Sequence, residues 1–126
     1  MLIGVIAVAG INYAVHRMPS SEMIAENEGE TLFGDVEYLS STIRINEDAS
    51  PTRQEQTLVH ELVHAMMFEA GIEDQDENLV NRLDKVFYQF LKQNTDFFER
   101  LDRPPEDKLG SEVEQIINWV ERGESE

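Results

Sequence analysis

Two histidines stand four residues apart in the segment His60-Glu61-Leu62-Val63-His64. Four residues is slightly more than one turn of α-helix, so on a helix both imidazoles project from one face and can bind one metal ion together. The carboxylate of Glu61, one residue after the first histidine, would then reach a water on the metal rather than the metal itself. The segment therefore predicts a metal site, and only a helix can form it.

The flanking sequence predicts that helix. Its start has two alternatives: Thr52 and Glu55 form a capping-box pair, or Ser50 is the N-cap with Pro51 at the first helical position. Gly71 supplies a left-handed stop at the other end. Apolar residues recur between these ends at helical spacing: Leu58, Val59, Leu62, Val63, Met66 and Met67. Both histidines are thus expected to lie against a core rather than in free solvent.

A third metal ligand has to come from elsewhere in the chain. The order His-Glu-x-x-His is that of zinc peptidases, and a catalytic zinc usually has three protein ligands and one open position. No histidine follows His64. The third ligand is therefore expected among the acidic residues Glu73, Asp74, Asp76 and Glu77. Spacing alone leaves these four as alternatives.

A second helix is predicted to begin within this acidic stretch, with Asp74 or Asp76 as its N-cap. The helix dipole also favours a carboxylate such as Glu77 in the first turn. One narrow polar face lies beside the apolar stripe of this helix and carries Glu77, Asn81, Asp84 and Tyr88. Glu77 can therefore face the histidine helix. The alternative is that all four residues form a solvated surface.

The same acidic stretch resembles the opening of a calcium loop, since Asp74, Asp76 and Asn78 alternate along it. An EF-hand loop needs glycine at its sixth position and glutamate at its twelfth. This chain has Leu79 and Lys85 at those positions. Calcium is therefore not expected.

Together these residues resemble the ImmA/IrrE-type small metallopeptidases of phages, prophages and mobile elements. In that family the HExxH helix is followed by a second helix with the pattern E-x-x-x-N, whose glutamate is the third zinc ligand. Glu77 and Asn81 match this pattern. The resemblance implies that zinc binds His60, His64 and Glu77, that Glu61 is the catalytic base, and that Asn81 lies beside the site.

The resemblance runs from about Gly34 to Asn94 and includes two predicted strands, Gly34 to Tyr38 and Thr42 to Asn46. Two departures stand out. Val63 occupies a position where better known members have glycine, and Leu83 to Asn94 replaces an alanine-rich run. The substrate of those members is therefore not carried over to this chain.

The order of the patterns, strands early and helices late, predicts an α+β fold. Leu2 to Val8 and Ile11 to Arg17 are expected to pair as a hairpin. With the later strands they would form a small N-terminal sheet of three or four strands. This sheet should pack on the HExxH helix and on the following glutamate-bearing helix, antiparallel or crossing nearby, as a minimal zincin-like domain. His16, alone in its strand, is expected to be structural.

A chain of 126 residues fits one domain, residues 1–126. Phe97, Phe98 and Leu101 are expected to complete its core. Beyond Pro104 and Pro105, apolar residues at i, i+3, i+4 and i+7 predict a C-terminal amphipathic helix at about residues 109–122. This helix is expected to pack on the domain, with docking on a partner as the alternative.

Composition restricts the environment and the partners. The chain has no cysteine, and a reducing cytoplasm is its simplest location. The apolar stretch from Met1 to Gly10 is too short to cross a bilayer and lacks a basic flank, so neither a membrane span nor a signal peptide is expected. The net charge of −16 argues against nucleic-acid binding but permits a basic protein partner, such as a DNA-binding regulator.

Two functions remain. The first is a zinc-dependent endopeptidase, encoded by a phage or mobile element, that hydrolyses a peptide bond in a protein substrate such as a regulator. The alternative is an acidic, metal-stabilised protein that sequesters a host or phage regulator without proteolysis. Glu61 favours the enzyme, because a structural site needs no base. The sequence identifies neither the substrate, nor the oligomeric state, nor the group that stabilises an oxyanion. Tyr88 lies about 16 Å along the helix from Glu77, which is too far for that role unless the chain folds back.

Overall fold

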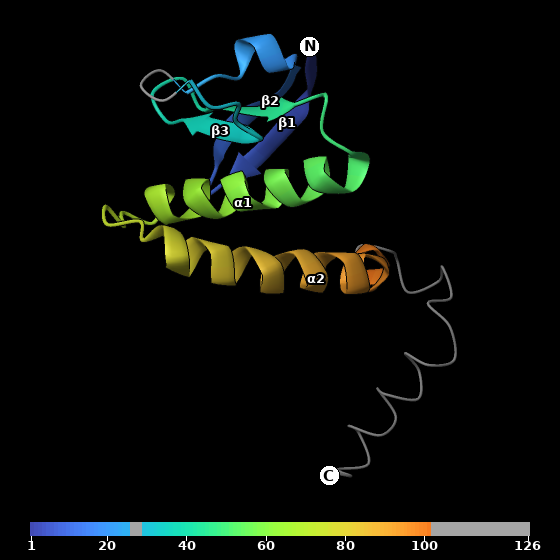
Figure 1. Ribbon diagram of the computed structural model, residues 1–126. Helices are drawn as coiled ribbons and strands as arrows, with labels where there is room; N and C mark the ends of the chain where they lie inside the picture. Colours follow the sequence, from blue (N-terminus) through green and yellow to red (C-terminus); the bar gives the residue numbers. More distant parts are fainter. Residues whose placement is uncertain (26–28, 102–126) are drawn as a thin grey trace, which may run out of the picture. The chain divides into compact units, whose positions relative to one another are not determined.

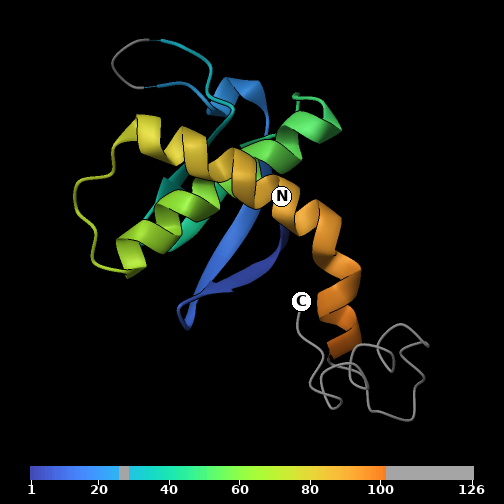
Figure 2. The same ribbon diagram turned by 90° about the horizontal axis from the view of Figure 1, so that it is seen from below.

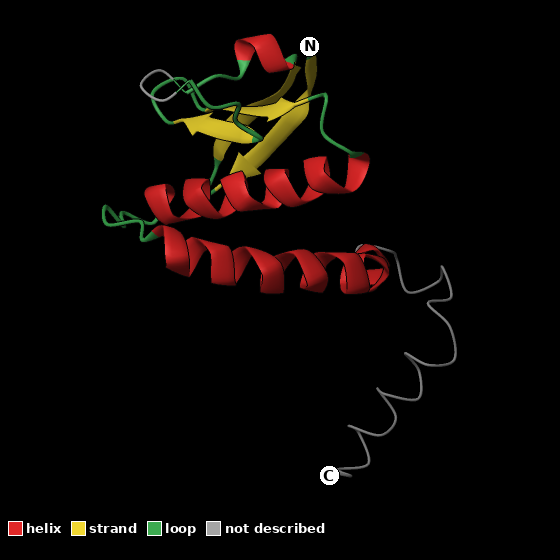
Figure 3. Cartoon of the chain, viewed as in Figure 1, coloured by secondary structure: helices red, strands yellow, loops and turns green. Residues whose placement is uncertain are grey.

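The computed structural model describes residues 1–25 and 29–101. The strands are β1 (Leu2–Val8), β2 (Ile11–Met18), β3 (Gly34–Glu37) and β4 (Thr42–Asn46); the helices are the 3-10 helix η1 (Ser20–Glu22), α1 (Pro51–Glu69) and α2 (Glu77–Leu101). Of the described residues, those up to Gln89 form one compact unit, and those from Phe90 to Leu101 belong to a second. The strands precede the long helices, as Figure 3 shows, and the predicted α+β fold is confirmed.

The four strands form one sheet in the order β1-β2-β4-β3. The predicted hairpin of β1 and β2 is antiparallel and turns at Ala9 and Gly10, both of which have positive φ. β4 pairs parallel with β2 and antiparallel with β3. The sheet therefore has two outer strands, β1 and β3, and the second of these lies next to the candidate site.

α1 lies between the sheet and the first part of α2 (Figure 1). One apolar cluster joins it to the sheet and contains Val8, Tyr13, Val15, Ile43, Ile45, Leu62 and Ala65. A smaller cluster joins it to α2 and contains Val63, Met67 and Val80, with Phe87 packed against it. Two sides of α1 are therefore covered by apolar contacts.

The ends of α1 show which capping alternative holds. Ser50 is the N-cap, its side chain accepts a hydrogen bond from the backbone N–H of Arg53 at 3.2 Å, and Pro51 is the first helical residue. At the other end Gly71 has a φ of 82°, the left-handed conformation expected of a helix stop. These two signals therefore set where α1 begins and ends.

The prediction that Phe97, Phe98 and Leu101 complete the core is wrong for the described residues. α2 continues to Leu101, and these three side chains are about half exposed or more. Phe98 packs against Phe90 and Phe97 instead, within the second unit. The helix predicted at about residues 109–122 lies outside the described residues, and the single domain over residues 1–126 stays a prediction. No helix in the described part of the chain is long and apolar enough to cross a membrane.

Candidate metal centre and active site

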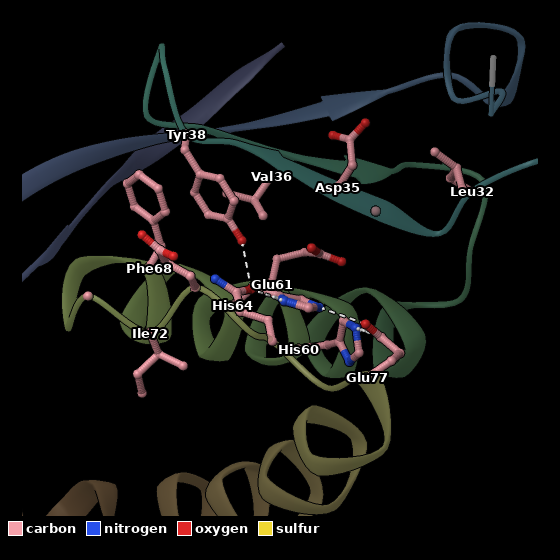
Figure 4. Close-up of a pocket in the computed structure, with 14 residues that line it drawn as sticks. Leu32, Asp35, Val36, Tyr38, His60, Glu61, His64, Phe68, Ile72 and Glu77 are labelled. Carbon is pink, nitrogen blue, oxygen red and sulfur yellow. Dashed lines mark hydrogen bonds and ion pairs between the residues drawn. The ribbon is translucent and has the colours of Figure 1, made fainter. Parts of the chain in front are cut away.

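The two histidines of the HExxH segment project from one face of α1, as their spacing predicts (Figure 4). Their ring centroids lie 5.0 Å apart, and the ring planes are nearly perpendicular. Both imidazoles are mostly buried, with side-chain exposures of 21% for His60 and 14% for His64. Burial restricts the rotamers of both rings and so limits their relative orientation.

Glu77 reaches both histidines from the first turn of α2. Its Oε1 lies 2.8 Å from Nε2 of His60, and its Oε2 lies 3.1 Å from Nε2 of His64. One ligand atom from each of these three residues lies within 4.8 Å of the other two, an arrangement that could hold a metal ion. The donor set of two imidazole nitrogens and one carboxylate oxygen suits zinc.

The other acidic candidates do not join this group. Asp76 occupies the N-terminal end of α2, where its side chain accepts a hydrogen bond from the N–H of Asn78 at 3.0 Å and its carbonyl accepts one from Val80. Glu73 lines the neighbouring cavity without belonging to the three-residue cluster. The helix start set by Asp76 is what directs the next residue, Glu77, towards α1.

The outward nitrogen of each histidine is also hydrogen-bonded. Nδ1 of His60 lies 2.6 Å from Oδ2 of Asp84, and Nδ1 of His64 lies 2.6 Å from Oε1 of Gln75. When each Nδ1–H donates to its oxygen, the lone pair of each Nε2 is left to face Glu77. Metal-binding histidines are held in this manner, so the residues present fit a zinc ion.

Burial and nearby charges shift the pKa of His60 in opposite directions. Burial lowers its pKa, but the hydrogen bond to Asp84 and the nearby carboxylates of Glu61 and Glu77 raise it, and the pKa lies above its ordinary value. The local field therefore favours positive charge. A divalent cation at the same place would be stabilised by the same carboxylates.

Gln75 connects three separate segments through one oxygen. Its Oε1 accepts from His64 on α1 and also from the hydroxyl of Tyr38, at 2.9 Å, beyond the end of β3. The ring of Tyr38 stacks on Phe68, with centroids 4.1 Å apart and planes 5° apart. Burial raises the pKa of Tyr38, and although the hydrogen bond with Gln75 opposes this rise, the charges of Glu61 and Glu77 add to it. The hydroxyl therefore stays a hydrogen-bond donor over the neutral pH range.

Glu61 is buried between α1 and β3, with an exposed fraction of 7%. Figure 4 shows its carboxylate pointing into the cavity rather than toward Glu77. Burial is the main cause that raises its pKa to about 7, with Asp35 and Glu77 adding to the rise while His60 and His64 oppose it. A carboxyl group poised near neutral pH is suited to accept and release a proton.

A cavity of about 920 Å³ opens beside these side chains and contains both histidines, Glu61 and Glu77. Its opposite wall is the outer strand β3 with its flanking residues Leu32 and Tyr38. A second cavity, of about 640 Å³, lies on the other side of His60 and Glu61. His60 and Glu61 line both cavities.

Gly34 lines both cavities at the start of β3, where the strand comes very close to α1. A Cβ at this position would lie 2.4 Å from Cγ2 of Thr57, 3.0 Å from the carbonyl oxygen of Arg44 and 3.5 Å from Cγ of Glu61. We therefore expect Gly34→Ala to push β3 away from α1 and to lower the free energy of unfolding by about 1–3 kcal/mol. Denaturant unfolding of the two proteins measures this difference.

Two further variants make this prediction specific. Gly4→Ala places a Cβ in open space, with nothing within 4 Å, and should change the free energy of unfolding by less than about 0.5 kcal/mol. Thr57→Ser removes the Cγ2 atom that the added Cβ of Gly34→Ala would meet, so the two changes combined should recover part of the loss. Equal stability of Gly34→Ala and wild type would contradict the close approach.

The family model for the IrrE N-terminal-like domain, Peptidase_M78, matches residues 15–88. This is more than half of the 126-residue chain. The chain belongs to the IrrE N-terminal-like family. Membership indicates a metallopeptidase-type function, and the matched range includes every side chain of the His60, His64 and Glu77 cluster. No curated protein and no solved structure is significantly similar to the chain.

In this IrrE-like domain the structure brings together His60, Glu61, His64 and Glu77, the four residues singled out from the sequence. Asn81 and Tyr88 line the smaller cavity with His60, and the hydroxyl of Tyr88 bonds to Glu55. His16 lies on β2 outside the cluster. The sequence reasoning did not identify Gln75, Tyr38 or the role of Asp84. Only Asp84 had a signal, since it lies two helical turns after Glu77 on the same polar face.

Proposed function

We propose that this IrrE-like domain is a zinc-dependent endopeptidase in which His60, His64 and Glu77 hold the metal and Glu61 is the catalytic base. The observation that carries the proposal is the convergence of two imidazole nitrogens and one carboxylate within 4.8 Å, beside a buried carboxylate that does not belong to the cluster. A purely structural metal site has no use for such a base.

Zinc, when bound, supplies Lewis-acid chemistry: it polarises a carbonyl group and makes water more acidic. The side chains of the domain do the rest. Glu61 takes a proton from the attacking water and then delivers it to the leaving nitrogen of the peptide. Asp84 and Gln75 keep the two imidazoles oriented, and the buried stem of Glu61 holds its carboxylate at the wall of the cavity.

The substrate is proposed to be an extended polypeptide. β3 is an outer strand of the sheet, and Gly34, Asp35 and Val36 of this strand line the larger cavity. The outer edge of a strand carries backbone N–H and C=O groups that can pair with an added strand. A peptide paired with β3 would pass Glu61 and continue towards the second cavity, which is lined by Phe33 and Tyr88.

Metal content is the first test. The purified chain, loaded with zinc and freed of excess, should contain about one zinc per chain, because the residues that the structure describes contain one set of three ligands. His60→Ala should lose the metal and also the zinc-dependent cleavage of an unfolded protein such as reduced casein. His16→Ala is the matched control, since it removes a histidine outside the cluster and should leave zinc content unchanged. Elemental analysis of the three proteins measures the difference.

Two results would contradict the proposal. Equal zinc loss in the His16 and His60 variants would place the metal elsewhere. Full zinc content without hydrolysis of any polypeptide would favour the second function, in which an acidic, metal-stabilised protein sequesters a basic regulator. We further propose that the substrate or partner is such a regulator, of phage or mobile-element origin. The net charge of −16 supports a basic protein partner. We also propose that the protein acts in the cytoplasm and contacts neither nucleic acid nor membrane.

A further inference from the structure

The outer strand at the far end of the sheet, β1, has an apolar and uncharged sequence, Leu-Ile-Gly-Val-Ile-Ala-Val. β1 pairs with β2 along one edge only. In an antiparallel ladder about every second residue directs its N–H and C=O away from the paired neighbour. In the described part of the chain, no strand pairs with the opposite edge of β1, so these groups face outward.

Hydrogen bonds to β2 fix the position of β1. The ammonium group of Met1 donates to the carbonyl of Arg17 at 2.7 Å, and the N–H of Arg17 donates to the carbonyl of Met1 at 2.9 Å. The register shifts between Leu2 and Gly4, but from Gly4 to Val8 every residue has a partner in β2. Another strand can therefore pair with the outer edge of β1 along Gly4 to Val8, where the backbone is regular.

The exposed side chains of β1 are also apolar, and two more exposed apolar residues, Met1 and Ile11, flank the strand. Met1 is 76% exposed, Val5 58% and Leu2 54%, and Ile3 and Ile11 are each about two-fifths exposed. Proteins usually protect outer strands with lysine, proline or a covering element, and β1 contains neither lysine nor proline. Figure 2 shows the tip of the β1–β2 hairpin projecting beyond α1. An edge of this kind favours pairing with another strand.

The charge distribution restricts the identity of that strand. All 26 acidic residues of the chain come after Ser21, the first being Glu22, whereas residues 1–21 contain one arginine and no acid. Two copies of a chain with a net charge of −16 repel each other at most surfaces. The β1–β2 hairpin itself has no carboxylate, and Glu69, which accepts a hydrogen bond from Tyr13, contacts β2 rather than β1. Two copies that meet along β1 therefore do not oppose carboxylates of that strand.

We propose that two copies of this chain associate by antiparallel pairing of β1 with β1, which joins the two sheets into one. Directly opposite residues in an antiparallel pair point to the same face. Either Val5 lies opposite Val5 of the second copy, or Ile6 lies opposite Ile6 and Val5 lies opposite Ala7. In both registers the opposed side chains are apolar or glycine. β1 is therefore self-complementary, as a two-fold interface requires.

Such a contact is small, so the dimer is expected to be weak, with a dissociation constant in the micromolar range. Its dependence on salt distinguishes it from binding of a basic partner. Salt screens the repulsion between two acidic chains, so the dimer should become tighter as the concentration of NaCl rises from about 0.05 to about 0.5 M. A complex held by opposite charges would become weaker over the same range.

The test uses the full chain without an N-terminal tag. Light scattering over about 5 to about 500 µM protein should show the mass rising from 14.5 kDa towards twice that value. The double variant Val5→Lys/Ala7→Lys opposes lysines in either register and should raise the dissociation constant at least about tenfold. Both side chains are exposed, so each chain should fold as before by circular dichroism.

The matched control is Leu39→Lys/Val86→Lys, which adds the same charge at two exposed apolar positions, 97% and 68% exposed, away from β1. It should dimerise as the wild type does. Amide hydrogen exchange in β1 should also slow as protein concentration rises. A mass that stays at 14.5 kDa at every concentration would overturn the proposal. So would β1 protection that is independent of concentration, or equal dissociation of the two double variants.

Discussion

Glu61→Gln should lower kcat/KM for peptide hydrolysis by about 10²–10⁴-fold while leaving zinc content and fold intact. Glutamine is nearly the same size as glutamate, and Glu61 does not belong to the cluster that could hold the metal. Its amide cannot accept the proton of the attacking water, so the loss should appear in kcat. Because burial disfavours the charged carboxylate, the uncharged amide should be tolerated without loss of stability.

The matched control for this variant is Glu73→Gln, which removes a carboxylate from the wall of the same cavity. Glu73 lies outside the three-residue cluster, so activity should stay within a few-fold of wild type. Zinc content, thermal unfolding and steady-state kinetics are measured on all three proteins. If Glu61→Gln retains full hydrolytic activity, Glu61 is not the base and the peptidase mechanism proposed above is wrong.

Asp84→Ala should weaken zinc binding by about 10–100-fold, although Asp84 is not one of the proposed ligands. Asp84 Oδ2 lies 2.6 Å from Nδ1 of His60, and its side chain is only 14% exposed. Without this carboxylate the imidazole loses the hydrogen bond that orients Nε2 towards Glu77. Competition with a chromogenic chelator measures the dissociation constant, and the zinc-free proteins provide a comparison of folding.

Variants of neighbouring residues should weaken zinc binding to different extents. Gln75→Ala should weaken zinc binding in the same way through His64, whereas Tyr38→Phe should have a smaller effect because the bond between His64 and Gln75 remains. Asn81→Ala is the matched control on α2, one turn before Asp84. It should bind zinc as tightly as wild type. Equal affinity for Asp84→Ala and Asn81→Ala would mean that the bond to His60 does not orient the metal site.

Much of the fold could be predicted because it depends on local patterns. A short apolar run indicates β1, and alternation of Tyr13 and Val15 with polar or small neighbours indicates β2. The segment between Ser50 and Gly71 has the start and stop signals of a helix. The parallel pairing of β2 with β4 could not be predicted, because it depends on packing between strands about 25 residues apart rather than on a turn. The order of the sheet, with β1 and β3 outermost, follows from that pairing.

The candidate site, like the fold, could be predicted from the sequence only in part. The spacing of His60 and His64 predicts a shared helix face, whereas spacing left four acids as alternatives for the third position. Glu77 was selected by the family resemblance, and the structure explains its direction through the helix start at Asp76. Gln75 and Tyr38 could not be found from the sequence, since each becomes relevant only when the segment before α2 lies across the end of β3.

The small size of the apolar cluster between α1 and α2 has a thermodynamic consequence. Three buried side chains and one partly buried ring join the two helices, and the candidate metal ligands come from both of them. An ion held there cross-links α1 to α2, and its binding free energy adds to the free energy that docks the second helix. The sheet and α1 have their own larger core and do not depend on that cross-link. Bound zinc would therefore raise the free energy needed to separate α2 from α1.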